Sequence, residues 1–209
     1  MALIETGRDL ERGALRLVAL EPRFGAALRT LGGGPLPLRR DAGGFAALAG
    51  AIVSQQVSLA SARAISDRLA AAGLVDAGAV RAASAAALAA CGLSRPKIRY
   101  LQALAGADLD YGALHRLPDE EVCRRLMDIP GIGRWSAELY LLQSLGRADV
   151  LPAGDLALRE ATRRLFDLPM RPSEPDLRAM AAAWAPVRAV AARLLWAYYA
   201  RVKQREGNP

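Results

Sequence analysis

Apolar residues recur with a helical period along almost the whole chain, and stretches that alternate as β-strands do are scarce. The helical patterns are short and are separated by glycine and proline, as in the loop GGGPLPLRR that begins at Gly32. No internal repeat or low-complexity linker divides the sequence. The pattern predicts an all-α protein, and 209 residues suffice for one substantial core or two small lobes.

Helical stretches are predicted over about residues 9–31, 119–128 and 134–145, and further helices are expected to begin near residues 155, 174 and 186. Two more helical runs lie within residues 45–73 and meet near residues 54–58, and shorter pieces follow over residues 75–107. The stretch DIPGIGRWSAELYL, which begins at Asp128, contains the turn between the helices predicted over residues 119–128 and 134–145. Pro130 ends one helix, and Gly131 and Gly133 give the backbone the freedom that a tight turn needs. Free N–H groups at the start of the next helix can bind phosphate, and Arg134 adds a charged donor. The hairpin is thus either a plain connector or a site that holds a nucleic-acid backbone.

The charge favours a polyanionic partner. The chain has 28 basic and 21 acidic residues and a net charge of +7, which suits nucleic acid, although an arginine-rich proteome would produce the same excess. Cys91 and Cys123 are too few and too far apart for a zinc site or a four-cysteine iron–sulfur cluster. We find no apolar leader and no membrane-span candidate, and therefore expect an intracellular, cytoplasmic protein.

Four segments carry a family resemblance: AIVSQQVSLASARAI, LMDIPGIGRWSAE, LPAGDLALRE and WAPVRAVAARLLWAYY. Their order and spacing resemble the helix-hairpin-helix (HhH-GPD) glycosylase superfamily, and the first and last are similar to its 3-methyladenine DNA glycosylase II branch. The resemblance implies one domain, residues 1–209, in the compact form without an N-terminal β-domain. It also implies two helical lobes with the active site in the cleft between them. One lobe spans about residues 44–145 with the hairpin at 119–145, and the other combines residues 1–43 with helices at 155–205.

Asp155 matches the family's catalytic carboxylate. By itself, an aspartate at a helix start after Ala153 and Gly154 is an ordinary N-cap, and the two roles are compatible because a cap holds the carboxylate in place. Cleavage of an N-glycosidic bond builds positive charge on the deoxyribose. A carboxylate ~4 Å away, at an effective dielectric constant of ~20, stabilises that charge by about 4 kcal/mol. The same group could orient or deprotonate the attacking water.

Trp135 stands where superfamily members that also nick the strand carry a Schiff-base lysine. The two lysines of this chain, Lys97 and Lys203, lie outside the hairpin, so we expect no lyase activity. Trp135 would instead stack on an extruded cationic alkylpurine, unless it is a core residue on the stripe of Leu139.

Other aromatic residues are pocket candidates. Trp184 is the second candidate, and Tyr140 and Phe45 are weaker ones, whereas Trp196 fits packing between helices.

The resemblance also implies contacts with DNA. Those at the hairpin are Gly131, Gly133, Arg134 and Ser136, with the glycines binding phosphate through backbone amides. Gln56 falls where relatives push a side chain into the gap left by the extruded base, and Gln55 is expected to be structural. Three backbone carbonyls match positions that hold a monovalent cation, Na⁺ or K⁺, in relatives: Met127, Ile129 and Ile132.

Together these features predict a monomeric, monofunctional DNA glycosylase of base excision repair. It would remove alkylated purines of the 3-methyladenine and 7-methylguanine class from double-stranded DNA, with no required cofactor. Two alternatives remain open. One is a glycosylase for deaminated or oxidised bases. The other is a non-enzymatic helix-hairpin-helix DNA-binding module, which would leave Asp155 and the WAPVR segment without a role.

Overall fold

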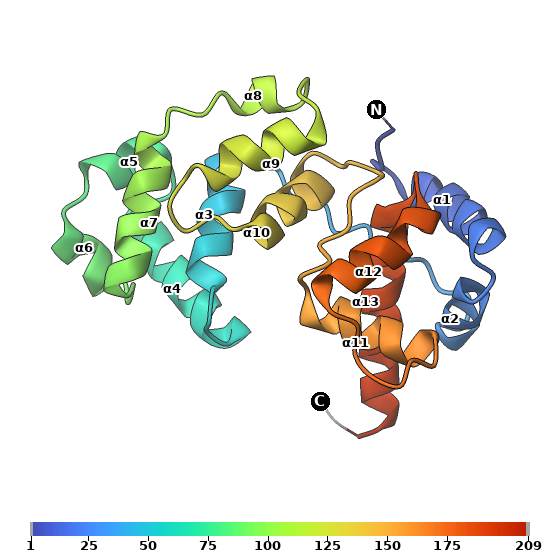
Figure 1. Ribbon diagram of the computed structural model, residues 1–209. Helices are drawn as coiled ribbons and strands as arrows, with labels where there is room; N and C mark the ends of the chain where they lie inside the picture. The colour runs from blue at the N-terminus through green and yellow to red at the C-terminus, as the bar shows by residue number, and fades with distance from the viewer. Residues whose placement is uncertain (1, 208–209) are drawn as a thin grey trace. The chain divides into compact units, whose positions relative to one another are not determined.

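The computed structural model describes residues 2–207, and these residues fold into helices joined by short loops (Figure 1). Within them extended pairing is limited to an isolated bridge between Leu3 and Arg147, which confirms the predicted all-α class. Two compact units are present: unit 1 comprises Met1–Arg40 and Leu141–Pro209, and unit 2 comprises Asp41–Tyr140. In the described part of the chain, no helix combines the length and the apolar character needed to cross a membrane.

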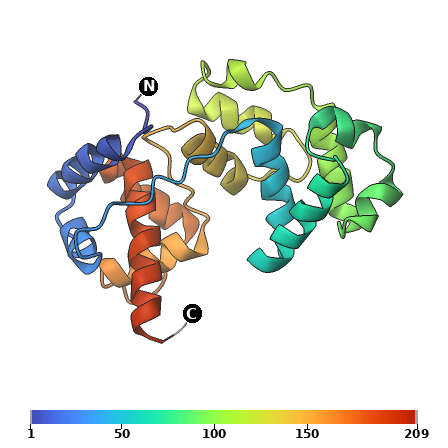
Figure 2. The same ribbon diagram turned by 180° about the vertical axis from the view of Figure 1, so that it is seen from behind.

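Unit 1 is arranged around its longest helix, α13. The helices of this unit are α1 (Gly7–Leu20), α2 (Phe24–Thr30), α11 (Leu156–Leu165), α12 (Glu174–Met180), the 3-10 turn η2 (Ala181–Trp184) and α13 (Arg188–Arg205). Helix α13 packs against α11, α2 and α1, and Figure 2 shows the two blue N-terminal helices beside the red α13. Segments from both ends of the chain therefore share one core.

The single helix predicted over residues 9–31 is wrong, because the chain forms α1 and α2 instead. Glu21 has an extended backbone, with φ −143° and ψ 95°, and Pro22 follows it. Proline disfavours the helical conformation of the residue before it, so α1 ends at Leu20 and a new helix starts at Phe24.

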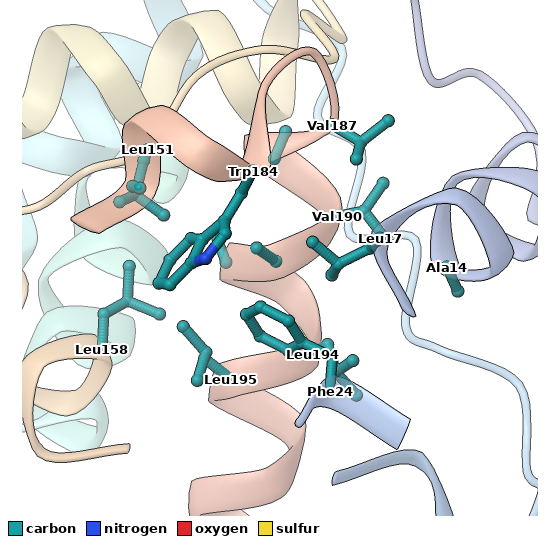
Figure 3. Close-up of a cluster of buried hydrophobic side chains, with 14 of the residues drawn as sticks. Ala14, Leu17, Phe24, Leu151, Leu158, Trp184, Val187, Val190, Leu194 and Leu195 are labelled. Carbon is teal, nitrogen blue, oxygen red and sulfur yellow. The ribbon is translucent and has the colours of Figure 1, made fainter. Parts of the chain in front are cut away.

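The core of unit 1 contains an aromatic cluster (Figure 3). The ring of Trp184 meets Phe24 edge-on with centroids 5.0 Å apart, and it lies 5.6 Å from Phe166. Leu194 and Leu195 of α13 belong to the same buried cluster. Trp184 is only 1% exposed, so its indole has no free face on which a base could stack. The prediction that Trp184 lines a substrate pocket is therefore wrong.

A buried arginine ties the loop after α2 to this core. Arg193 is 2% exposed and donates hydrogen bonds to the carbonyl oxygens of Leu38, Ala189 and Leu142 at 2.9, 3.2 and 3.0 Å. Burial lowers the pKa of Arg193 to about 10, which leaves the guanidinium charged at neutral pH. The three carbonyls thus supply the polar contacts that a buried cation requires.

Unit 2 is a bundle of short helices. They are α3 (Gly44–Ser54), α4 (Leu59–Ala71), α5 (Ala77–Ala82), α6 (Ala85–Ala90), α7 (Arg95–Gly106), α8 (Tyr111–Leu114), α9 (Asp119–Met127) and α10 (Arg134–Leu139). Helix α7 packs against α3, α5 and α6, and α9 packs against α10. The π-helical turn η1 (Tyr140–Ser144) follows α10 directly, so the predicted helix over residues 134–145 corresponds to α10 and η1.

Short polar side chains mark where many of these helices begin. In α1, the side chain of Thr6 accepts from the backbone N–H of Asp9, and the Asp9 carboxylate accepts from the backbone N–H of Thr6. The hydrogen bond from the Thr6 hydroxyl is the main reason that the pKa of Asp9 is lowered to about 2. Other N-cap residues whose side chains accept a backbone hydrogen bond are Ser58, Asp76, Ser84, Asp110, Asp155 and Ser173. Such caps satisfy N–H groups that the helix itself leaves unpaired.

Candidate active site and nucleic-acid interface

The hairpin turn between α9 and α10 is tight and well anchored. The backbone N–H of Ile132 donates to the carbonyl of Ile129 at 3.1 Å, and both isoleucine side chains are buried. Gly131 has φ +91°, and a Cβ atom there would lie 2.3 Å from Cγ of Tyr100. Both the backbone conformation and the close approach of the ring therefore require glycine at this position.

The charged and polar side chains of the hairpin are less available than the sequence suggests. Arg134 donates two hydrogen bonds of 2.8 Å to the carboxylate of Glu120 and a third of 3.1 Å to Glu138. These carboxylates, Glu120 above all, raise the pKa of Arg134 and offset its charge. Ser136 is buried in α10. Arg134 is therefore ion-paired within the hairpin, and the side chain of Ser136 is covered. Both residues stay predicted DNA contacts. Gly133 and part of the turn are exposed, so backbone N–H groups there are accessible to a phosphate.

Trp135 lies in the first turn of α10 and is 38% exposed. It is therefore not a core residue, which was the alternative to a stacking role. The partly exposed indole is compatible with a base-stacking surface beside the hairpin turn.

Tyr140 and Phe45 are buried in unit 2. The hydroxyl oxygen of Tyr140 accepts a hydrogen bond of 3.1 Å from the backbone N–H of Gly44, the first residue of α3, and burial raises the pKa of the phenol. Phe45 is 8% exposed and borders a groove of about 180 Å³ whose lining comes from α3, α4, α7 and residues 74–75. Tyr140 thus supports the start of α3, and its role in a substrate pocket stays a prediction. Phe45 lies outside the hairpin, and nothing in the groove connects it with Trp135.

The SQQ segment, residues 54–56, ends α3 and begins the loop to α4, and it is held against the hairpin turn. The side-chain Nε2 of Gln55 donates a hydrogen bond of 2.8 Å to the carbonyl oxygen of Gly131. Gln56, the next residue, is exposed and has a left-handed backbone with φ +54°. Gln55 is thus structural as expected. Its partner lies 76 residues away, and no local pattern in the sequence predicts that the two residues are in contact.

Asp155 lies in unit 1, where it is the N-cap residue of α11. Its Oδ1 atom accepts hydrogen bonds from the backbone N–H of Leu158 at 2.9 Å and from Nε1 of Trp196 at 3.2 Å. Trp196 belongs to α13 and is partly buried. The capping prediction is confirmed, whereas the interpretation of Trp196 as packing alone misses its polar contact with the carboxylate.

The loop that leads to Asp155 is fixed to the start of α13. Arg188 donates to the two carboxylate oxygens of Asp149 at 2.7 and 2.9 Å, and the backbone N–H of Ala189 donates to the carbonyl of Ala148 at 3.0 Å. Two parallel hydrogen bonds between arginine and a carboxylate also constrain orientation. The arginine of WAPVR therefore supports the loop on which Asp155 is carried.

Lys97, one of the two lysines, is buried and hydrogen-bonded to the backbone of another helix. It is 8% exposed, and its Nζ donates a hydrogen bond of 2.7 Å to the carbonyl of Val53 near the end of α3. Burial lowers the pKa of this ammonium group. Lys97 therefore supports the end of a helix inside unit 2.

The side chains of the described residues form no cluster of three or more His, Cys, Asp or Glu that could hold a metal ion. Cys91 and Cys123 are buried thiols, and burial raises the pKa of Cys123 to about 11. The carbonyls of Met127, Ile129 and Ile132 stay predicted ligands for a monovalent cation, and that of Ile129 also accepts the hydrogen bond that closes the turn.

The family to which the chain is similar covers the same segments of the sequence. Residues 49–187, which include the SQQ loop, the hairpin and Asp155, match the HhH-GPD superfamily of base excision DNA repair proteins. The chain belongs to this superfamily. A curated relative, DNA-3-methyladenine glycosylase 1 of Schizosaccharomyces pombe, is 41% identical over 113 residues, which are 51% of this chain and 49% of the relative. The chain spans about half the length of the first curated relatives it matches.

Two solved structures resemble this HhH-GPD chain over nearly all of its length. The S. pombe 3-methyladenine DNA glycosylase, solved in complex with abasic DNA, has a TM-score of 0.78 and 30% identity, covering 88% of this chain and 95% of that chain. A DNA-3-methyladenine glycosidase from Bacillus halodurans has a TM-score of 0.80 and 30% identity, with 94% and 92% covered.

Proposed function

We propose that this HhH-GPD protein is a monofunctional DNA glycosylase that removes alkylated purines of the 3-methyladenine and 7-methylguanine class from double-stranded DNA. The observation that carries the proposal is the arrangement at Asp155. Asp155 matches the family's catalytic carboxylate in the sequence pattern, and its Oδ1 atom accepts hydrogen bonds from Leu158 and Trp196. The names of the similar proteins from S. pombe and B. halodurans support the choice of substrate.

The reaction breaks the bond between C1′ of the deoxyribose and the purine nitrogen. The bonding electron pair leaves with the base, so a cationic alkylpurine departs neutral and positive charge develops on the sugar. Asp155 stabilises that charge by about 4 kcal/mol at ~4 Å and an effective dielectric constant of ~20, which is about three powers of ten in rate. Water then adds to C1′ and loses a proton, which Asp155 is placed to accept, and an abasic site remains.

Recognition of the base falls to Trp135. A purine turned out of the duplex can stack on the exposed indole, and a cationic base gains about 0.5–2 kcal/mol from the π-electrons of the ring. Because alkylated purines already carry the positive charge that makes them good leaving groups, stacking and one carboxylate suffice for this chemistry.

Recognition of the DNA backbone falls to the hairpin turn. The phosphate contacts come from backbone N–H groups of Gly131 and Gly133 and from Arg134, whose guanidinium is paired with Glu120 and Glu138 in this structure. Gln56 fills the gap left by the extruded base. We further propose that the protein acts as a monomer without a required cofactor, with a monovalent cation at the carbonyls of the hairpin.

A panel of lesion-bearing duplexes tests the proposal. Purified protein is offered 7-methylguanine, 3-methyladenine, uracil and 8-oxoguanine in otherwise identical duplexes, and hot alkali afterwards breaks any abasic sites. We expect strand breaks only after alkali and only with the alkylated purines. Product from uracil or 8-oxoguanine alone would indicate a glycosylase for deaminated or oxidised bases. Binding without product from any lesion would indicate a non-enzymatic DNA-binding module.

Asp155→Asn is the matched variant, because it removes the charge and retains both the shape and the capping oxygen. We expect it to lose about three powers of ten in excision rate while still binding lesion DNA. Excision within a few fold of the wild type would refute the catalytic assignment.

A further inference from the structure

The loop between α3 and α4 and the hairpin turn are joined directly within unit 2. Gln55 ends α3 as its C-cap residue, and its backbone N–H donates to the carbonyl of Ile52 at 3.3 Å. Its side chain donates to the carbonyl of Gly131 at 2.8 Å. One residue therefore closes a helix with its backbone and reaches the hairpin turn with its side chain.

Helix α7 supports both partners of this contact from one face. Lys97 donates to the carbonyl of Val53 at 2.7 Å, two residues before Gln55, and Tyr100 places its ring against Gly131. Residues three apart on a helix project from the same side. The end of α3 and the hairpin turn thus rest on a common surface and are linked to each other by Gln55.

Gln56 is the residue that this arrangement constrains. Its backbone is left-handed at φ +54°, a conformation that residues other than glycine adopt at a cost and keep only when their surroundings enforce it. Gln55 holds the chain on one side of it. On the other side Ser58 caps α4 by accepting from the backbone N–H of Ser61 at 3.1 Å. The exposed side chain of Gln56 is therefore presented from a loop that is fixed at both ends.

We infer that Gln55 is a positioning residue, which holds Gln56 in fixed register with the hairpin turn so that both engage one duplex as a preformed surface. The inference rests on the proposed function, in which the turn binds phosphate and Gln56 fills the gap left by the extruded base. A loop that is ordered before binding loses less conformational freedom when it inserts into DNA. Gln55 itself need not touch the DNA.

Gln55→Met in the full chain removes the donor and keeps most of the volume. We expect single-turnover excision of 7-methylguanine from a duplex to slow about tenfold, since small misplacements of positioning groups have effects of this size or larger. The effect should nearly vanish when Gln56 is already alanine, because the misplaced side chain is then absent. Double-mutant cycles measure such coupling directly. A merely structural role would slow excision equally in both backgrounds, and that result would overturn the inference.

The matched control is Arg81→Met. Arg81 also donates to a backbone carbonyl within unit 2, that of Ala105 at 2.7 Å, but it connects α5 with the end of α7. We expect this variant to excise at the wild-type rate, with at most a lower thermal midpoint. A loss of rate equal to that of Gln55→Met would assign the effect to general loosening of unit 2 and overturn the inference.

Gln55→Glu provides an independent test that uses pH. A carboxylate cannot donate to the Gly131 carbonyl, whereas the protonated acid can. The excision rate of this variant relative to the wild type should therefore be low at pH 7.5 and recover as the pH falls toward 5. A pH-independent ratio would contradict the proposed hydrogen bond.

Failure of the inference can be told apart from failure of the proposed function. If the wild type excises none of the lesions, the proposed function fails, and the variants are compared by their affinity for a duplex with a tetrahydrofuran abasic analogue. Gln55→Met should then weaken that binding only when Gln56 is present. Equal affinities of the wild type and Gln55→Met would overturn the inference. If the wild type excises and Gln55→Met matches it, only the inference fails.

Discussion

The contact between Trp196 and Asp155 predicts that a residue on α13 controls the rate of base excision. Trp196→Phe keeps an aromatic ring in place but removes the indole N–H, which donates to Oδ1 of Asp155 at 3.2 Å. The backbone N–H of Leu158 still donates to the same oxygen at 2.9 Å, so the carboxylate keeps its cap. The substitution therefore removes a hydrogen bond that helps to orient the proposed catalytic group.

The size of the effect follows from the type of bond. A hydrogen bond to a charged group contributes about 1.5–3 kcal/mol, and the observed 3.2 Å is at the long end of the range, which favours the lower figure. About 1.5 kcal/mol corresponds to roughly a tenfold slower chemical step. Asp155→Asn, which removes the charge itself, should reduce the rate by about three powers of ten. The two variants are thus expected to differ by about two orders of magnitude.

Single-turnover excision of 7-methylguanine with enzyme in excess measures this step, because the rate then reports chemistry rather than product release. Tyr199→Phe is the matched control. Tyr199 lies on the same helix, and its ring faces the cationic groups of Arg164 and Lys203 at 5.9 and 5.5 Å, contacts that phenylalanine retains. An unchanged rate for Trp196→Phe, or an equal loss for Tyr199→Phe, would refute the reasoning.

Four further predictions concern other parts of the molecule. Trp135→Ala should reduce excision of cationic alkylpurines about five- to thirtyfold more than that of neutral bases, because cation–π attraction acts only on the former; equal losses in a folded variant would remove Trp135 from the site. Wild-type protein treated with borohydride during the reaction should leave no covalent adduct with DNA, and a trapped adduct, mapped by mass spectrometry, would contradict the monofunctional assignment. Gly131→Ala should lower the free energy of unfolding by about 2–4 kcal/mol in denaturant titrations, since it combines a positive φ with a collision against Tyr100. A change below about 0.5 kcal/mol would contradict the turn geometry. Asp9 has a pKa of about 2 in the folded chain, below its ordinary value of 3.8, so its stabilising contribution is present above pH ~4 and is lost as the pH falls toward 2. Asp9→Asn should therefore make the thermal midpoint less dependent on pH in that window.

Local features of the sequence were sufficient for the helical class, the hairpin and the cap at Asp155. Helical periodicity, the effect of Pro130 on the preceding residues and the N-cap preference of aspartate all act within about four residues along the chain. The break between α1 and α2 is of the same kind, since Pro22 causes it. These features could be predicted because short-range sterics and hydrogen bonding determine them.

The roles of the three tryptophans depended on the tertiary structure. Trp184 is buried against Phe24, Trp135 is partly exposed in the first turn of α10, and Trp196 donates to Asp155 from 41 residues away in the sequence. Helical periodicity can place each indole on a face of its helix. Whether that face meets a core, solvent or a carboxylate depends on which other helix packs there.

The contacts of Arg134 and Gln55 likewise could not be predicted from the sequence, although both side chains are polar. The partner of Arg134, Glu120, is 14 residues away on the neighbouring helix, and the Gly131 carbonyl that accepts from Gln55 is 76 residues away. The sequence alone predicted that an arginine and two glycines would lie at the hairpin turn. Only the packing of α3, α7, α9 and α10 decided that Arg134 pairs with Glu120 and that Gln55 connects the loop to the turn. Such contacts depend on distances in space rather than along the chain.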